Sequence, residues 1–598
     1  MSTERDYLGI LNALDEIPFP VGKKLLIDVL LGESKNQSIV KNRLFRLKSF
    51  GSIAYSASEL SDLIESLITN RLIEYVRLAG FQKVLVLTAK GNEELKSPSH
   101  KDISVQAARF QTRITNDDKR LFAEFSFFLS QYTDEQKKAI VCPKEKIVCI
   151  AGAGSGKTEV LTKRIEFLVK FRGLDPTKIL AITFTRKARQ EMMARVSFPV
   201  HIETFNSFCE GILNKYNNIA YDRPVRVIAY KDKIRLLRSV LAEEHIAMGK
   251  ALETYFTKRQ MQGKLQEELA RIFLNDCFYF RSRMHERKIP NMSNAEFDLI
   301  RLVAEGIDNR MKEEGLRDFD DQIKDSISLF KRIPTLVPKF DHVLVDEFQD
   351  INAQQEELLS LLKPKNVFCV GDPRQSIFGW RGSKIEFVLT FHEKNPDAEI
   401  VSLTKNFRSK KPIVTLINAA IRGMQLPDLE PVHDGKRGIF MLSFENEQGE
   451  YEFVLQRILE EKVAKKEIFV LARTNKQLVE LAERFAVHGI PCLIRSEELK
   501  RSKAEDADAV TIATIHAIKG MQAKTVFVVG ITPQNFPCRG SDHPIIDLIR
   551  EEYDREEEER RLLYVALSRA KESLYISYSG KSHSRFLSDE MKKILEAK

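Results

Sequence analysis

The sequence predicts an α/β protein with two parallel sheets, a helical insertion and a separate N-terminal domain. Beyond residue 120, short apolar runs typical of strands alternate with segments typical of helices, as parallel sheets with crossover helices require. The expected strands are 146–150, 179–183, 342–345, 367–370, 468–472, 510–513 and 526–529. We place the division between the two sheets near Pro396, and a chain of 598 residues has room for several domains.

The first hundred residues follow a different pattern. A capping box at 56–59 opens a helix with one apolar face, which consists of Leu60, Leu63, Ile64, Leu67 and Ile68. Two strand-like runs follow at 72–77 and 83–88, and a short helix is expected near 92–96. Helices followed by a hairpin are typical of a winged helix. We therefore expect a winged-helix domain at 1–100 and a linker at 101–120.

Basic amphipathic helices replace the strand pattern between Gly211 and Gly315. We interpret this stretch as a helical insertion in the first sheet domain, which we expect over 121–395. The second sheet domain is expected over 396–598.

The composition restricts the class of protein. Lys and Arg total 94 against 85 Asp and Glu, and this formal net charge of +9 suits a polyanionic partner. The seven cysteines show no C-x-x-C spacing, so we expect reduced thiols and neither a zinc site nor an iron–sulfur cluster. No apolar run approaches the roughly 20 residues that cross a bilayer, so we expect a cytoplasmic protein without a membrane partner.

A glycine-rich run follows the first expected strand of the first sheet. It reads Ala151-Gly152-Ala153-Gly154-Ser155-Gly156-Lys157-Thr158. Glycines let backbone N–H groups turn toward phosphate oxygens at the start of a helix. Lys157 would reach the β- and γ-phosphates, and the Thr158 hydroxyl would bind Mg²⁺. The usual first glycine of this pattern is Ala151, so the match is close rather than strict.

An acidic run closes the strand at 342–345 and strengthens this interpretation. Asp346 would lie beside the glycine-rich run at the carboxyl edge of the sheet, where its carboxylate can hold the metal. Glu347 follows and would orient or deprotonate the attacking water. The alternative is an ordinary acidic strand end. Together the two runs predict hydrolysis of a nucleoside triphosphate such as ATP, with Mg²⁺ as cofactor.

Further runs carry a resemblance to a known family. They lie at 132–136, 182–188, 203–208, 371–382, 406–409, 514–520 and 564–570. The longest reads Gly371-Asp372-Pro373-Arg374-Gln375-Ser376-Ile377-Phe378-Gly379-Trp380-Arg381-Gly382. In order and spacing these runs resemble the superfamily 1 helicases of the UvrD/Rep/PcrA type, over about residues 120–598. The resemblance implies two RecA-like P-loop motor domains.

The resemblance also implies roles at the phosphates. Arg408 and Arg569 match the family's paired arginine fingers, which stabilise charge on the γ-phosphate during transfer. Gln375 matches the glutamine that senses this phosphate. An exposed surface salt bridge is the alternative role for an isolated arginine.

The base and ribose contacts depart from the family pattern. Gln136 matches the adenine-reading glutamine, but Phe407 stands where the family has a tyrosine against the base. Glu159 replaces an arginine that packs on adenine, and Gln522 replaces a glutamate that commonly contacts the ribose. We therefore expect looser discrimination between bases.

The same resemblance implies contacts with DNA. Trp380 matches an aromatic residue that stacks on a base, and Phe184 and Phe205 are expected to extend this platform. His516 lies in another run that meets DNA in the family. Burial in the core is the alternative for the aromatic residues. Asn206 stands where many members have a histidine, which leaves that contact open.

Two family elements are missing. The interval between Arg408 and Thr511 is too short for the large subdomain inserted there in UvrD-like proteins, and a polar linker at 497–508 takes its place. After Arg569 the segment 573–586 stands where the family has a longer hairpin that acts as a strand-separating pin, and we expect that hairpin to be cut away here.

The N-terminal domain suggests a substitute for that pin. From 21–32 to 87–91 it resembles the RQC winged helix of RecQ-type helicases, which holds duplex DNA and presents a β-wing at the junction. We expect the hairpin to place Phe81 as a wedge at a single-strand/duplex junction, with Arg77 and Lys83 contacting phosphates. The alternatives are that Phe81 belongs to the core, or that the domain serves protein contacts.

These features predict a monomeric, ATP-dependent 3′–5′ DNA helicase or single-strand translocase, acting in DNA repair or replication. One alternative is a translocase that removes proteins from DNA without separating duplexes. The other is a DNA-binding scaffold with weak ATPase activity.

Overall fold

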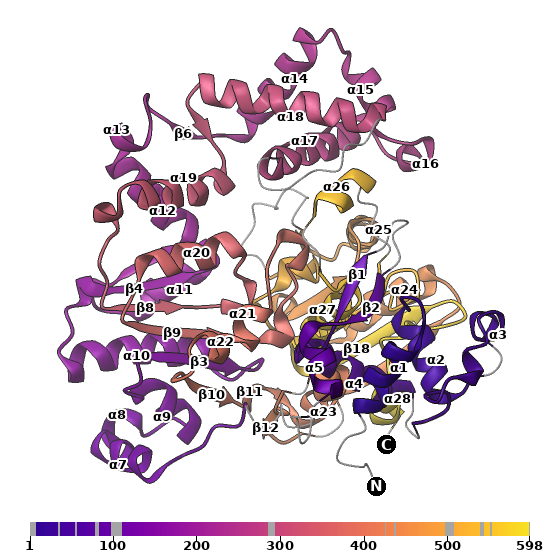
Figure 1. Ribbon diagram of the computed structural model, residues 1–598, viewed down its shortest axis with the longest axis horizontal. Coiled ribbons are helices and arrows are strands. Elements are labelled where there is room, and N and C mark those ends of the chain that lie inside the picture. The colour runs from indigo at the N-terminus through magenta and orange to yellow at the C-terminus, as the bar shows by residue number, and fades with distance from the viewer. Residues whose placement is uncertain are drawn as a thin grey trace. The chain divides into compact units, whose positions relative to one another are not determined.

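The computed structural model describes residues 7–33, 36–53, 57–77, 83–96, 98, 110–284, 294–424, 426–435, 438–496, 508–538, 543–550 and 553–596. The chain divides into two compact units, whose elements are labelled in Figure 1. The N-terminal unit contains Met1–Arg113 and Ile421–Leu429. The main unit contains Ile114–Ala420 and Glu430–Lys598.

The N-terminal unit is a winged helix, as the sequence predicts. Its elements are α1 (Tyr7–Glu16), α2 (Lys23–Leu31), α3 (Gln37–Lys41), η1 (Leu44–Arg46), α4 (Ala57–Thr69), β1 (Ile73–Arg77), β2 (Lys83–Leu87) and α5 (Ala89–Lys96). β1 and β2 pair antiparallel from Ile73↔Leu87 to Arg77↔Lys83, and Val21 bridges to Leu85. The apolar face of α4 contributes to the core, because Leu60, Ile64 and Leu67 are fully buried.

The expected linker is shorter than predicted. α7 (Asn116–Glu124) begins inside the stretch 101–120, and Thr115 caps it by exchanging hydrogen bonds with Asp118. Phe81 and Gly80, the expected tip of the wing, lie outside the described residues.

The first sheet of the main unit is parallel. Within the described ranges its strand order is β10-β3-β9-β8-β4-β5. The strands are β3 (Lys146–Ala151), β4 (Ile179–Thr183), β5 (His201–Thr204), β8 (His342–Val345), β9 (Asn366–Gly371) and β10 (Glu399–Leu403). β10 pairs with β3 from Glu399↔Ile147 to Leu403↔Ala151, so the first sheet continues past Pro396. The first sheet thus ends at Leu403, shortly after the division predicted near Pro396.

The second sheet is also parallel, with the order β13-β18-β17-β14-β16-β15. Its strands are β13 (Ile439–Phe444), β14 (Ile468–Ala472), β15 (Cys492–Arg495), β16 (Val510–Thr514), β17 (Ala523–Val528) and β18 (Ala570–Ser579). A separate pair, β11 (Lys405–Lys410) and β12 (Glu430–His433), lies between the two sheets in the chain. The two predicted parallel sheets are thus confirmed.

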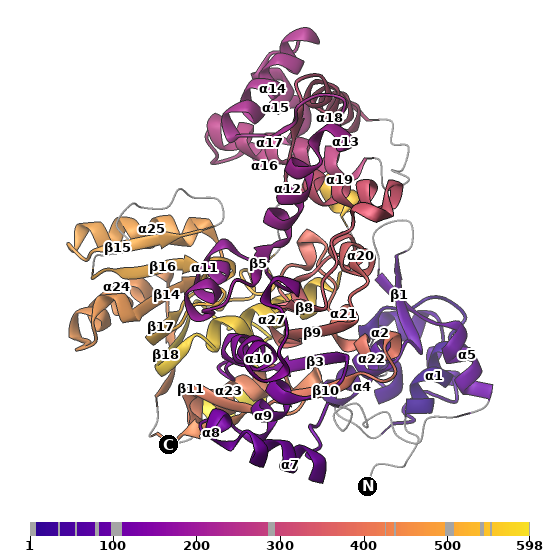
Figure 2. The ribbon, with the colours of Figure 1, turned by 90° about the vertical axis from the view of Figure 1, so that its left-hand side faces the viewer.

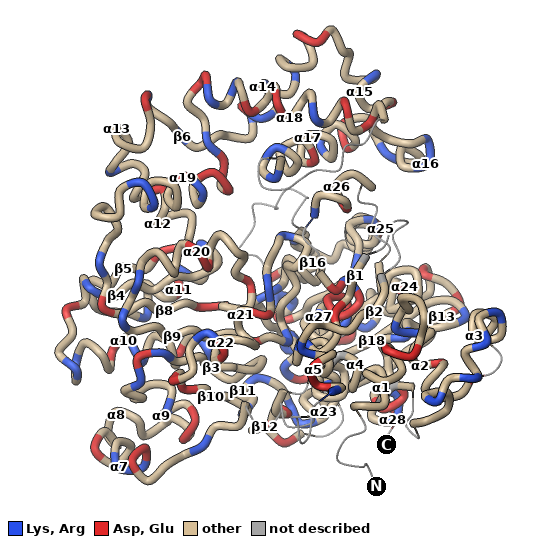
Figure 3. Tube along the Cα trace, in the orientation of Figure 1, with Lys and Arg blue, Asp and Glu red and all other residues tan. Residues whose placement is uncertain are grey.

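A helical insertion interrupts the first sheet between β5 and β8, as predicted. Its helices include α12 (Phe205–Lys215), α14 (Tyr230–Glu243), α15 (Met248–Tyr255), α17 (Gln266–Arg283), α18 (Ala295–Glu313) and α19 (Phe319–Arg332). Fully buried Phe273 and Ile300 belong to a core of its own. Figure 2 shows α14 to α18 gathered away from both sheets, and Figure 3 shows that these helices carry acidic as well as basic side chains.

A segment from the second half of the chain completes the core of the insertion. α26 (Pro544–Ile549) buries Ile545, Ile546 and Ile549 in it, and Figure 1 shows α26 beside α17. The His543 ring stacks on the Tyr255 ring at 3.8 Å between centroids. Its Nε2 also lies 2.6 Å from the Tyr255 carbonyl oxygen. The insertion is therefore joined to the first sheet by its own chain connections, and α26 from the second half of the chain packs against it.

Two further observations concern the whole chain. All seven cysteines carry free thiols. Among the described helices, none is long and apolar enough to cross a bilayer.

Candidate active site

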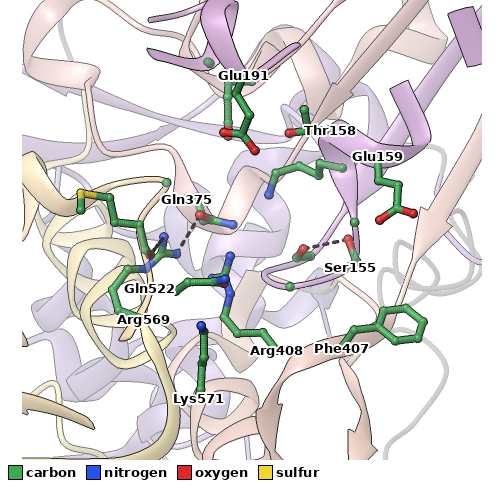
Figure 4. A pocket seen from close by; sticks show the side chains of 18 of the residues that line it. Ser155, Thr158, Glu159, Glu191, Gln375, Phe407, Arg408, Gln522, Arg569 and Lys571 are labelled. Atoms are coloured by element: carbon green, nitrogen blue, oxygen red, sulfur yellow. Dashed lines mark hydrogen bonds between the residues drawn. The ribbon is translucent and has the colours of Figure 1, made fainter. Parts of the chain in front are cut away.

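A cavity of about 1110 Å³ lies at the carboxyl ends of β3 and β8 in the main unit. Lys157, Asp346 and Gln375 line it from the first sheet domain. Arg408 follows β10, and Arg569 directly precedes β18. Both line the opposite side of the cavity, as Figure 4 shows. The sequence runs predicted to act together are thus brought to one cavity.

The glycine-rich run wraps the end of this cavity. Gly154 and Gly156 adopt left-handed backbone conformations with φ of 72° and 84°, which favour glycine. A Cβ on Gly154 would lie 2.6 Å from the Arg408 Cβ, so the close approach of β11 also requires glycine there. The Ser155 hydroxyl donates to the Gly152 carbonyl at 2.8 Å and closes the loop.

A helix begins where this loop ends. α10 (Lys157–Arg172) starts at Lys157, and the first N–H groups of any helix lack partners within it. These groups and the positive end of the helix dipole favour an anion. The Lys157 Nζ lies 3.4 Å from the Ala151 carbonyl oxygen, on the cavity wall. The loop therefore has the geometry of a phosphate site.

Oxygen donors for a divalent cation line the same cavity. The Thr158 hydroxyl and the Asp346 carboxylate both belong to it, and Mg²⁺ prefers such ligands together with phosphate oxygens. Burial and the neighbouring Glu347 carboxylate raise the pKa of Asp346 to about 7. Two adjacent buried carboxylates, Asp346 and Glu347, suit a site that binds a cation. Bound Mg²⁺ would neutralise charge on the phosphate oxygens.

Glu347 is held in an unusual backbone conformation. Its φ of 50° lies in the left-handed region, which is costly for a residue with a side chain. The Gln349 side-chain amide donates to the Glu347 carboxylate at 2.5 Å. Burial by itself raises the pKa of Glu347, but the charges of Lys157 and Lys519 outweigh it and hold this pKa below its usual value. Glu347 is therefore ionised and suited to accept a proton from water.

Arg569 is fully buried and bound on all sides. Its guanidinium donates to the carbonyls of Val565 and Met521 and to the Ser568 hydroxyl. It also donates to the Gln375 side-chain oxygen at 3.0 Å. Burial, reinforced by the Arg408 cation, lowers the pKa of Arg569 to about 9. A bound polyanion would relieve this repulsion between the two cations.

Arg408 is positioned by the chain segment that touches the glycine-rich loop. Asn406 donates to the Ala153 carbonyl at 2.8 Å, and the Phe407 N–H donates to the Gly154 carbonyl at 3.0 Å. The Arg408 side chain donates to the Ser568 carbonyl at 3.1 Å, while its buried Nε has no hydrogen-bond partner among the described residues. Guanidinium donors of Arg408 therefore remain for a ligand.

The expected base contacts are only partly in place. Phe407 and Gln522 line the cavity, and the Phe407 ring is 41% exposed, so it presents a surface for stacking. Gln136 is buried and already engaged. Its side-chain amide donates to the Ser155 carbonyl and accepts from the Thr133 N–H. Here Gln136 braces the glycine-rich loop, and its role as adenine reader stays a prediction.

Four rings gather near the 371–382 run. Phe184 stacks on Phe378 at 5.7 Å, and Trp380 and His516 each lie within 6.5 Å of Phe378. The Arg381 guanidinium lies over Trp380 at 4.4 Å. Trp380 and Phe184 are partly exposed, as a base-stacking platform requires.

One predicted DNA contact needs correction. Phe205 is 3% exposed because it begins α12 with its ring packed inward, so the core alternative holds for this residue. The Asn206 amide is also engaged, since it donates to the Phe319 carbonyl and the Gln322 side chain. For His516, burial and nearby cations lower the pKa to about 3, so its ring is neutral.

The 371–382 run connects this platform to the cavity. Its Gln375 donates to Asp372 at 2.7 Å while accepting from Arg569. Four residues later, the Gly379 N–H donates to the Glu558 carboxylate at 2.6 Å. Arg561 donates to the Ser376 carbonyl at 2.7 Å. Glu558 and Arg561 belong to α27 (Arg555–Leu567), so one helix of the second domain holds the whole run.

Sequence reasoning missed several residues of this site. Lys519 donates to both oxygens of Asp350, at 2.8 and 2.6 Å, and to the Gln375 carbonyl, which links the two sheet domains. Lys410, Lys571 and Lys187 line the nucleotide cavity. Lys519 lies in the run at 514–520, and Lys571 directly follows the run at 564–570. Their places in or beside these runs were the sequence signal that could have identified them.

Comparisons with protein families agree with this site. The model of the UvrD/REP helicase N-terminal domain matches residues 132–396, and that of the UvrD-like helicase C-terminal domain matches 401–499 and 492–581. The RQC domain model matches residues 5–111.

Individual relatives cover part of the chain. The ATP-dependent DNA helicase PcrA of Staphylococcus epidermidis is 33% identical over 382 residues, which is 60% of this chain and 50% of that protein. The PcrA protein of Staphylococcus aureus is 31% identical over 388 residues, which is 61% of this chain and 50% of that protein. The chain thus spans about half the length of the curated relatives it matches.

Among solved structures, the C-terminal domain of a possible DNA helicase from Lactobacillus plantarum WCFS1 aligns with 30% of this chain and 92% of its own. The identity is 17% and the TM-score is 0.23. The family models rest instead on both sheet domains and on the N-terminal unit. The chain belongs to the UvrD-like helicases, with two RecA-like motor domains and an RQC domain.

Proposed function

We propose that this protein is an ATP-dependent DNA helicase that moves 3′ to 5′ along single-stranded DNA. One observation carries the proposal: the run 371–382 touches Arg569 in the nucleotide cavity through Gln375 and supplies Trp380 to the aromatic platform. A change at the nucleotide therefore has a short path to the bound strand. The PcrA relatives, named as ATP-dependent DNA helicases, support the same activity.

Hydrolysis follows from the residues around the cavity. The glycine-rich loop and Lys157 bind the phosphates, and Thr158 and Asp346 hold Mg²⁺. Glu347 orients water and accepts its proton as the terminal phosphate leaves. Arg408 and Arg569 stabilise the negative charge that develops on the transferred group. Gln375 shares a hydrogen bond with Arg569, so loss of that phosphate alters the position of the 371–382 run.

Single-strand binding follows from the platform. Stacking on Phe184 and Trp380 tolerates any base, and each base stacked on an aromatic ring contributes about 1–3 kcal/mol. Lys519 of the second motor domain donates to Asp350 of the first and so links the two domains beside this platform. When the cavity opens or closes, the DNA contacts of one motor domain therefore move relative to those of the other. The 3′ to 5′ direction is proposed from the family resemblance.

A second function competes with unwinding. β15 ends at Arg495 and β16 begins at Val510, so the connection between these neighbouring strands is too short for a large inserted subdomain. β18 runs as a strand of the second sheet through Ser579, where the family has its pin. Both observations favour a translocase that clears proteins from single strands, unless the winged helix separates the duplex.

The test measures ATP turnover with and without single-stranded DNA, followed by unwinding of duplexes with a 3′ or a 5′ tail. We expect DNA to stimulate turnover and only the 3′-tailed duplex to open. Trp380→Ala should lower single-strand affinity and DNA stimulation while leaving the DNA-free turnover near normal. Turnover that ignores DNA in the unaltered protein would reject the proposal, and unfolding of Trp380→Ala would assign this side chain to the core instead.

A further inference from the structure

Lys571 is a cation of the nucleotide cavity to which no role has been assigned. It lies in β18, two residues after Arg569, and lines the cavity from the second motor domain. Figure 4 shows its side chain pointing into the cavity from the side of Arg408. Its position thus resembles that of the arginine fingers rather than that of a surface lysine.

The environment of the Lys571 ammonium leaves its charge available. Its nearest acidic atom is an oxygen of Glu467, 3.9 Å away and beyond hydrogen-bond distance. That Glu467 oxygen has no hydrogen-bond partner among the described residues. The Lys571 side chain is 30% exposed, so it is neither buried in the sheet nor free in solvent. Partial desolvation strengthens its attraction for an anion in the cavity.

Most donors of Arg569 are already engaged in the present arrangement. Its guanidinium already donates to four protein groups, including Gln375. It therefore fixes the position of Gln375, and Arg408, Lys410 and Lys571 are further cations after β10 that line the cavity.

We propose that Lys571 binds the terminal phosphate of the nucleotide, beside Arg408. The assignment rests on the ATPase function proposed above. Arg408, Arg569 and Lys571 place three positive charges on one side of the cavity, and Lys157 stands on the other. Such an arrangement complements the extra negative charge of a triphosphate over a diphosphate. Because Lys571 belongs to the second motor domain, it would contact the phosphate only when the two motor domains close around the nucleotide.

The experiment uses the full-length protein and compares Lys571→Met with Lys571→Arg. Methionine keeps most of the apolar stem and removes the charge, while arginine keeps the charge. A charge-assisted hydrogen bond contributes enough for an effect of about ten- to a hundredfold. We expect Lys571→Met to weaken binding of a non-hydrolysable ATP analogue by about that factor and to leave ADP binding within about twofold. Lys571→Arg should recover most of the loss.

The control is Lys524→Met on the neighbouring strand. Lys524 is 48% exposed and lies 3.9 Å from Glu572, and it does not line the cavity. It should bind both nucleotides as the unaltered protein does. Equal weakening of ADP and the ATP analogue in Lys571→Met would overturn the terminal-phosphate assignment, as would no weakening of either. Failure of the unaltered protein to hydrolyse ATP with DNA would instead reject the proposed function itself.

Discussion

At the scale of single residues, Glu347 is the clearest candidate for catalysis. Its left-handed backbone and its hydrogen bond from Gln349 hold the carboxylate at the cavity. Because general base catalysis contributes about 10²- to 10⁴-fold, Glu347→Gln should lower turnover by that amount. The variant should still bind ATP and remain on single-stranded DNA. Turnover and retained nucleotide on a DNA column are the measurements.

Lys157→Ala is the companion variant, since it removes the phosphate contact rather than the base. It should abolish turnover and also weaken ATP binding. Glu347→Gln turning over at the rate of the unaltered protein would remove Glu347 from the proposed mechanism.

Glu558 provides a residue-scale prediction on pH. This carboxylate accepts from the Gly379 N–H, and burial raises its pKa from 4.5 to about 7 despite the opposing charge of Arg561. Glu559, the other charged neighbour, raises this pKa further. The folded state thus prefers protonated Glu558, so ionisation destabilises the fold above pH 7. This cost disappears as the pH falls from 7 to 4.5.

Glu558→Gln should therefore stabilise the main unit by about 1–3 kcal/mol at pH 8, and the gain should vanish near pH 4.5. Denaturant unfolding at several pH values measures it. Glu556→Gln is the control, because Glu556 is 49% exposed and paired with Arg585. A gain that does not depend on pH would contradict the assigned ionisation.

Site residues differed in how far the sequence could predict them. Asp346 and Glu347 directly follow one buried strand, and Lys157 follows another after the glycine-rich loop, so local pattern alone brings them to one sheet edge. The contacts of Gln136 and Phe205 depend on packing instead. The sequence does not tell whether the Gln136 amide contacts the loop or a base, and only the fold shows that it donates to the Ser155 carbonyl. Phe205 has the same local pattern whether its ring faces solvent or the core.

At the scale of elements, the predicted strands were those buried on both faces. β4 and β14 are buried throughout, which gives the continuous apolar runs typical of a parallel sheet. β5 and β13 lie at the sheet edges and each has only one buried residue, so neither forms a continuous buried run. The division predicted near Pro396 falls just before β10, because a proline marks a turn but does not tell which sheet the next strand joins.

The docking of α26 could not be predicted either, because its partner surface lies more than two hundred residues earlier. Ile546 is 3% exposed within the core of the insertion. Ile546→Ala should cost about 2–5 kcal/mol of local stability, as for other large-to-small core changes. Faster amide exchange in α17 and α18 is the expected measurement.

Leu459→Ala serves as the control, since that side chain is 60% exposed on α24 (Glu447–Glu460). It should leave exchange in the insertion unchanged. If Ile546→Ala also leaves α17 and α18 protected, then α26 merely rests on the insertion and does not stabilise it.

At the scale of the whole molecule, the sequence predicts a motor without the family's usual means of separating strands. A motor that pulls one strand opens a duplex only when something blocks the other strand at the junction. Inserted apolar side chains separate base pairs in other DNA-binding proteins. The RQC domain at 5–111 is the remaining candidate for this role, with Phe81 as the predicted wedge.

Deleting residues 1–100 should therefore spare ATP turnover stimulated by single-stranded DNA yet strongly reduce unwinding of a 3′-tailed duplex. The deletion has a side effect, because Ile421–Leu429 belongs to the same unit as the winged helix and buries Ile421 and Leu429. Phe81→Ala avoids this problem and should give a milder defect in unwinding with normal turnover. Tailed-duplex unwinding and turnover are measured on the same preparations. Full unwinding by both variants would assign the winged helix to attachment alone and favour the translocase.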